Sequence, residues 1–263
     1  MKPDLFKKYN EGNDIFGYPQ VYKDLILYPI KIRDTKMQDL FYLIFSNPKN
    51  YIPNKDILKS SYLKFVIYVI QASYNSEGNE LLQGVKDILS YITKKDVSIE
   101  YRSAQGEGLA SITLFLRIGD NLYSENDFDD MREIILEQNG MTIDFVEEFN
   151  PDLEENLNFL NRANAGISFQ DEIFTFCAIM KLSLKEVEEY TMYQFKYAME
   201  KLLALKEYDM YKPLIVSGQV ELKSGEIKPY LYRSVKAGRY DSIKMDVDDF
   251  KNNSDIMKAS QNQ

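Results

Sequence analysis

The segment from Asp120 to Glu155 constrains the fold of this chain most, because it combines an extreme charge with helical spacing of its apolar residues. It holds thirteen Asp and Glu residues and a single basic residue, Arg132. The segment therefore carries a charge of −12, whereas the whole chain carries −9. We expect amphipathic helices that bury a narrow apolar stripe and turn their carboxylates outward. One face of the protein is accordingly predicted to be strongly anionic.

Two helices are predicted within this segment. The first begins after Ser124, a residue type that caps helix N-termini, and stops at Gly140. The second begins at the pair Asn150 and Pro151 and runs to about Ala163. Their inward stripes consist of Phe128, Met131, Ile135 and Gln138 in the first helix and Leu153, Leu157 and Leu160 in the second. The outward carboxylates either keep the protein soluble or dock a basic partner. The candidate docking residues are Asp127, Asp129, Asp130, Glu133, Glu147 and Glu148.

The residues before this block also follow mostly helical spacing, with one interruption. Helices are predicted over 37–45, 55–74 and 79–93. An alternation of apolar and polar residues over 97–101 and again over 112–118 then predicts a β-hairpin.

The residues after the block are rich in helix start signals. Ser168, Ser183 and Thr191 each stand three residues before Asp, Glu or Gln, which is the spacing of a capping box. We therefore predict three consecutive helices over 169–181, 184–190 and 192–206. Beyond Pro213 the helical pattern weakens, and strands are predicted over 216–222 and 230–235.

Together these patterns predict an α+β fold that is predominantly helical, with helical bundle regions and one or two small antiparallel β-hairpins. Four regions are expected along the chain. Residues 1–35 form an N-terminal arm or edge strand, since Pro29 argues against a continuous helix there. Residues 36–165 hold helices, the β-hairpin and the acidic helices, and residues 166–237 hold a helical bundle with a C-terminal hairpin. Residues 238–263 form a polar tail that either stays flexible or orders against a partner.

Composition excludes several kinds of chemistry. The chain has no histidine, which removes the usual general base, the Ser-His and Cys-His nucleophile pairs and the commonest zinc ligand. The single cysteine, Cys177, lies among apolar residues without a nearby base, so we expect it in the core. The glycines Gly106 and Gly108 lack the rest of a phosphate-binding loop. We therefore predict a protein that is not an enzyme and has no catalytic residue, metal site or cofactor.

Charge and hydropathy bear on partners and location as well. A sequence pI of about 4.8 disfavours nucleic-acid binding. The longest apolar-looking run, 62–74, is shorter than the ~20 residues that cross a bilayer, and the N-terminal residues do not resemble a signal peptide. Neither nucleic acid nor a membrane is an expected partner.

Several stretches resemble proteins from the tail modules of tailed phages and prophages of Gram-positive bacteria. They are FDDMREIILEQNG, then NPDLEENLNFLNR, then QDEIFTFCAIMKLSLKEVEEYTMYQFKYAMEKL, and earlier YPIKIRD and IPNKDILKSSYLKFV. The phrase SLKEVEEYTMYQFKYAMEKL is also similar to the helical segment of tail assembly chaperones. Those chaperones are small acidic helical proteins that coat the tape measure protein before the tail polymerises, and this chain is longer than a typical one.

The resemblance implies a function in phage assembly rather than catalysis. Its expected partners are other phage tail proteins, above all the tape measure protein, and further copies of the chain itself. The expected location is the host bacterial cytoplasm during assembly, or the virion if the chain is a minor structural component. A further alternative is an acidic inhibitor of a host protein, since an acidic surface can mimic nucleic acid.

Overall fold

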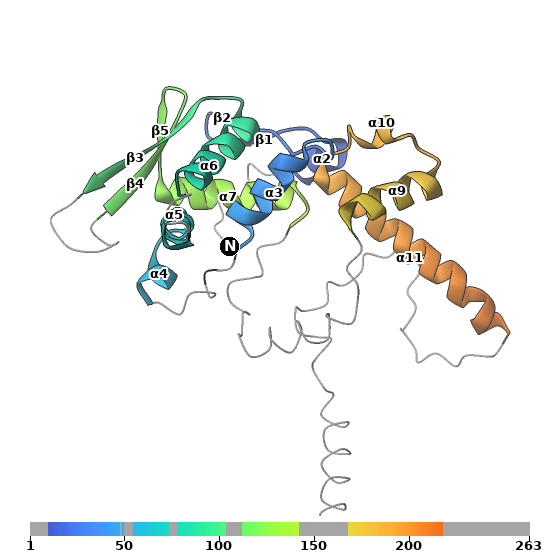
Figure 1. The fold of residues 1–263 in the computed structure, drawn as a ribbon. Coiled ribbons are helices and arrows are strands. Elements are labelled where there is room, and N and C mark those ends of the chain that lie inside the picture. The colour runs from blue at the N-terminus through green and yellow to red at the C-terminus, as the bar shows by residue number, and fades with distance from the viewer. Residues whose placement is uncertain are drawn as a thin grey trace, which may run out of the picture. The chain divides into compact units, whose positions relative to one another are not determined.

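The computed structural model describes residues 10–47, 49, 55–73, 78–103, 112–141 and 168–217. Contacts divide the chain into two compact units, and all described residues belong to the unit made of 1–147 and 167–232. The fold class is confirmed, since helices dominate and two small antiparallel sheets accompany them (Figure 1). The helices are α2 (Glu11–Phe16), α3 (Thr35–Phe45), α4 (Lys55–Lys59), α5 (Tyr62–Ser73), α6 (Gly78–Thr93), α7 (Glu125–Gln138), α9 (Phe169–Met180), α10 (Leu184–Val187) and α11 (Met192–Val216). The strands are β1 (Gln20–Tyr22), β2 (Leu25–Leu27), β3 (Val97–Ser103), β4 (Ile112–Ile118) and β5 (Asn121–Ser124). The division into four regions stays a prediction.

The segment predicted as an arm or edge strand contains the short helix α2 and the hairpin of β1 and β2. The side chain of Asn10 caps α2 by accepting a hydrogen bond from the amide of Gly12. In the hairpin, Val21 pairs with Ile26 on the exposed face. The buried side chains of this segment are Tyr22, Leu25, Leu27, Ile30 and Ile32. This part of the chain therefore contributes directly to the hydrophobic core.

The single helix predicted over 55–74 is wrong, because the chain breaks it into α4 and α5. Two serines explain the break. The hydroxyl of Ser60 donates to the carbonyl of Ile57 at 2.7 Å, and the hydroxyl of Ser61 accepts from the amide of Lys64 at 3.2 Å. Serine side chains compete with the helical ladder in this way and favour helix ends. The helices predicted over 37–45 and 79–93 are confirmed as α3 and α6.

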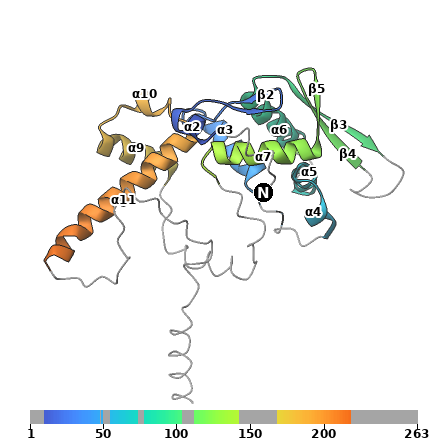
Figure 2. The same cartoon turned by 180° about the vertical axis from the view of Figure 1, so that it is seen from behind.

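The predicted hairpin is confirmed as β3 and β4, and a third strand that was not predicted extends it. β5 pairs antiparallel with β4, so the sheet order is β3, β4, β5. Gly119 has φ +57° in the two-residue turn between β4 and β5, a conformation that suits tight hairpin turns. β5 leads directly into α7, which packs against α5, β1, β4 and β5 (Figure 2).

The three capping signals of the C-terminal helices are confirmed. Ser168 accepts from the amide of Asp171, Ser183 forms a full capping box with Glu186, and Thr191 exchanges two hydrogen bonds with Gln194. α11, however, runs to Val216 rather than to 206. It continues through Pro213, which deletes one backbone donor close to the end of the helix. The strand predicted over 216–222 is not present at its start, because Val216 ends α11 and Ser217 lies in a turn. Residues 218–222, like the strand predicted over 230–235, lie outside the described residues.

A strand-like contact joins the N-terminal segment to the turn before α11. The amide of Ile32 donates to the carbonyl of Tyr190, and the amide of Met192 donates to the carbonyl of Ile30, both at 2.9 Å. Between them, Lys31 and Thr191 form an antiparallel bridge. Segments almost 160 residues apart in sequence thus share backbone hydrogen bonds.

Candidate functional site

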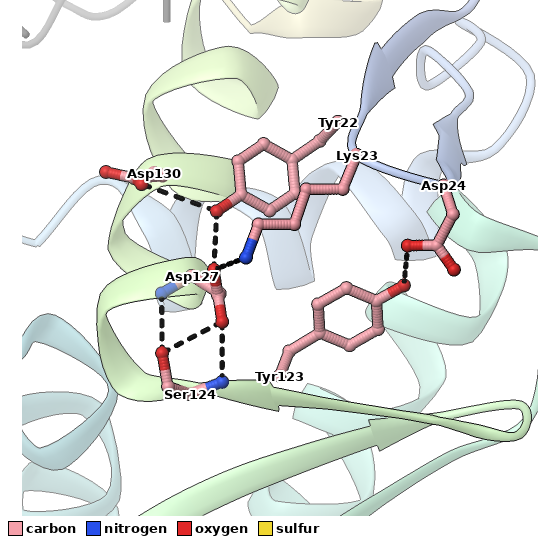
Figure 3. A network of polar contacts seen from close by, with 7 residues as sticks. All are labelled: Tyr22, Lys23, Asp24, Tyr123, Ser124, Asp127 and Asp130. Atoms are coloured by element: carbon pink, nitrogen blue, oxygen red, sulfur yellow. Dashed lines mark hydrogen bonds and ion pairs between the residues drawn. The ribbon is translucent and has the colours of Figure 1, made fainter. Parts of the chain in front are cut away.

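The predicted docking residue Asp127 lies in a network that holds the start of α7 against the β1–β2 hairpin. Its carboxylate completes the capping box with Ser124 and also accepts from the hydroxyl of Tyr22 at 2.7 Å and the ammonium of Lys23 at 2.5 Å (Figure 3). Burial alone would raise the pKa of Asp127. The hydrogen bonds from Lys23, Tyr22 and Ser124 together outweigh burial and hold that pKa well below its usual range.

Asp130 and two tyrosines complete this network. The hydroxyl of Tyr22 lies 3.3 Å from the carboxylate of Asp130, and the hydroxyl of Tyr123 donates to Asp24 at 2.9 Å (Figure 3). Burial, together with the neighbouring carboxylates, raises the pKa of Tyr22 far above its ordinary value. For Tyr123, burial and the bond to Asp24 raise the pKa to about 12. Both tyrosines therefore remain neutral hydrogen-bond donors at physiological pH.

Asp129 faces the helix α5 rather than open solvent. Its carboxylate accepts from the backbone amide of Tyr62 at 3.0 Å, and burial raises its pKa. Arg132, the one basic residue of the acidic block, is buried beside it. Its guanidinium lies 3.6 Å from the ring centre of Tyr62, and its Nε donates to the carbonyl of Phe45 at 2.9 Å. Burial lowers the pKa of Arg132.

The four predicted docking residues on α7 are therefore half-buried, and three of them form named contacts within the fold. Glu133 is half-buried as well, whereas Glu147 and Glu148 lie outside the described residues. α7 also buries more than the predicted stripe, since Ile134, Leu136 and Arg132 are buried as well. The docking role of these carboxylates stays a prediction. Asp127, Asp129 and Asp130 accept hydrogen bonds that join α7 to neighbouring parts of the fold.

The C-terminal helices carry several exposed apolar side chains, as do α2 and the β1–β2 hairpin. On α9, Phe176 and Cys177 face the core, while the opposite side carries Phe174, which is 60% exposed, and Ile179. The exposed Met180 and Leu184 follow at the end of α9 and the start of α10. The sequence predicted the burial of Cys177, and that prediction is confirmed.

Lys196 occupies the place where α11 meets α3 and the end of α7. Its ammonium lies 5.0 Å from the ring centre of Tyr42 and 3.5 Å from the carbonyl of Asn139. Burial lowers the pKa of Lys196 to about 8, and the negative charge of Glu172 opposes this shift. Gly140, just beyond α7, has φ +72° and brings the chain close to this side chain.

The described residues contain no cluster that could hold a metal ion and no helix that could span a membrane. Within them, no three His, Cys, Asp or Glu side chains gather as they would around a metal ion. No helix in the described part of the chain is long and apolar enough to cross a membrane. That the protein lacks a cofactor, a metal site and a catalytic residue stays a prediction.

Comparison with known proteins finds a similarity that covers the C-terminal helices. No curated protein and no solved structure matches the chain. Residues 161–234 match the YomV second domain, a phage-associated family whose name derives from a Bacillus prophage. The region with the exposed apolar face of α9 is thus similar to a phage domain, in agreement with the phage origin that the sequence predicted.

Proposed function

We propose that this chain is a non-enzymatic phage tail assembly protein, a chaperone that covers apolar helices of a longer tail protein such as the tape measure protein. The outer side of α9 carries this proposal, because Phe174 and Ile179 are exposed there on a helix whose other side already belongs to the core. A chaperone of this kind must offer an apolar surface to amphipathic helices and remain soluble while doing so. The phage-associated match over 161–234 supports a role in a phage, and the net charge of −9 favours solubility.

Co-expression with the tape measure protein of the same genome tests the proposal. The wild-type chain is expected to keep that protein soluble and to co-purify with it. Phe174→Asp is expected to abolish both effects while leaving the circular dichroism spectrum unchanged, since the side chain is mostly exposed. Tyr101→Asp is the matched control, because Tyr101 is an aromatic residue 76% exposed on β3, outside the matched region. If both variants behave like the wild type, α9 is not the binding surface. If the wild type itself fails to bind, the chaperone proposal is wrong.

A minor structural component of the virion is the main alternative. Mass spectrometry of purified virions separates the two, because a transient chaperone is absent from finished particles and a structural component is present. The alternative of an acidic host inhibitor has less support, since Asp127, Asp129 and Asp130 accept hydrogen bonds within the fold.

A further inference from the structure

The C-terminal half of α11 carries exposed apolar side chains on the face that buries Met192 nearer the start of the helix. Leu203 and Met210 are 60% and 59% exposed, whereas Phe195 and Leu202 on other sides of the same helix are buried. Leu203 and Met210 are seven residues apart, which places them on one face about 10 Å from each other. Seven-residue spacing supplies one of the two apolar positions per heptad that a seam between two helices uses.

Two opposite charges flank the stripe of Leu203 and Met210. Lys206 and Glu207 lie between Leu203 and Met210 along the helix, and both are exposed. Consecutive residues are about 100° apart around a helix, so the two side chains fall on opposite sides of the line through Leu203 and Met210. Neither forms an ion pair with another residue in the part of the chain that the structure describes. The stripe is thus bordered by a cation on one side and an anion on the other.

This arrangement complements a second copy of itself in one orientation only. When two such helices lie parallel about a two-fold axis, the left side of one meets the right side of the other, and Lys206 of each copy approaches Glu207 of its partner. When they lie antiparallel, like sides meet, so that Lys206 faces Lys206 and Glu207 faces Glu207. Opposite charges across an interface fix its register and orientation, and like charges oppose it.

We propose that α11 is a homodimer seam in which two copies of the chain pack parallel, with Leu203 and Met210 at the centre and two reciprocal pairs of Lys206 with Glu207 at the edges. The same patch then serves both subunits, as in other two-fold interfaces. The chain is acidic overall, and these pairs offset part of the repulsion between two copies. This inference does not depend on the chaperone proposal, which concerns α9.

Charge reversal with sedimentation velocity on the full chain tests the seam. The wild type is expected to show a monomer–dimer equilibrium. Lys206→Glu alone and Glu207→Lys alone are each expected to raise the dimer dissociation constant about tenfold or more. The double variant K206E/E207K exchanges the charges and is expected to restore wild-type affinity within about threefold. A wild-type chain that stays monomeric up to about 0.5 mM overturns the proposal, as does a dimer that both single reversals leave unchanged.

Oxidative cross-linking tests the orientation separately. In the parallel seam, Met210→Cys is expected to form a disulfide-linked dimer, because residue 210 of each copy faces its counterpart. The wild type is the control for Cys177, which is buried. An antiparallel pair centred between Lys206 and Glu207 instead links Leu203→Cys of one copy to Met210→Cys of the other in a mixture of the two variants. A cross-link found only in that mixture overturns the parallel seam.

Discussion

Replacing Lys196 with methionine is expected to stabilise the protein at pH 6. Methionine keeps an unbranched apolar stem of similar length and removes the ammonium. In the wild type that ammonium is poorly solvated beside Tyr42 and the end of α7, which is why burial lowers its pKa to about 8. Folding therefore carries a cost whenever Lys196 is charged.

The size of this cost follows from the pKa. A change from 10.5 to about 8 corresponds to about 3 kcal/mol at 1.36 kcal/mol per pKa unit. Partial exposure reduces this figure, and the variant also gives up the contact with the Tyr42 ring, worth about 0.5–1 kcal/mol. The net gain in the free energy of unfolding at pH 6 is about 1–2 kcal/mol.

The pH dependence gives the sharper check. Because the folded-state pKa is lowered, the cost is complete below pH 8 and disappears as pH rises from there toward 10.5. Urea unfolding followed by circular dichroism measures the free energy of unfolding of both proteins. The difference between variant and wild type is expected to fall by about half between pH 6 and 9.5. Lys185→Met, at an exposed site on α10, is expected to change stability by less than about 0.5 kcal/mol at either pH. A variant that is less stable than the wild type at pH 6, or a gap that does not narrow, refutes the reasoning.

Three further predictions concern other contacts. Asp127→Asn is expected to lower the free energy of unfolding by about 1–3 kcal/mol at pH 7, because it weakens charged hydrogen bonds. Since the folded-state pKa of Asp127 is lowered, the stabilisation by this carboxylate is present above about pH 4 and is lost as pH falls. The urea midpoints of variant and wild type should therefore converge in acid, and a difference that stays constant with pH would contradict the assignment. Gly140→Ala is expected to cost about 1 kcal/mol in thermal unfolding, because φ is +72° there, and an unchanged melting temperature would show that the turn relaxes without strain. Glu189→Gln removes the surface ion pairs with Lys31 and Arg33 and is expected to lower the melting temperature only slightly, because exposed pairs contribute little. A loss that persists in ~1 M salt would mean that these contacts are not screened as surface pairs are.

The helix starts were the features that the sequence predicted best, because a capping side chain bonds to a backbone amide only three residues further along the chain. Ser124, Ser168, Ser183 and Thr191 all start helices where their spacing predicted. Contacts between segments that are distant in the sequence could not be predicted in this way. Nothing within the acidic block shows that Tyr22, over 100 residues earlier, donates to Asp127.

The candidate surfaces show the same limit. Periodicity identifies a helix face that is apolar, but it does not say whether that face meets the core. In α9 both faces are apolar, and only the fold separates the buried Phe176 from the exposed Phe174. In α11, Pro213 and several charged residues obscured the last ten residues of the helix.

The bridge between Lys31 and Thr191 has a consequence for synthesis on the ribosome. Residues 30–33 leave the exit tunnel long before their partners at 188–192, and the delay is about 8–32 s at ~5–20 residues per second. Throughout that interval the backbone groups of Ile30 and Ile32 await their partners. A nascent chain arrested before residue 188 is therefore expected to be more sensitive to protease around residues 28–34 than one released at full length.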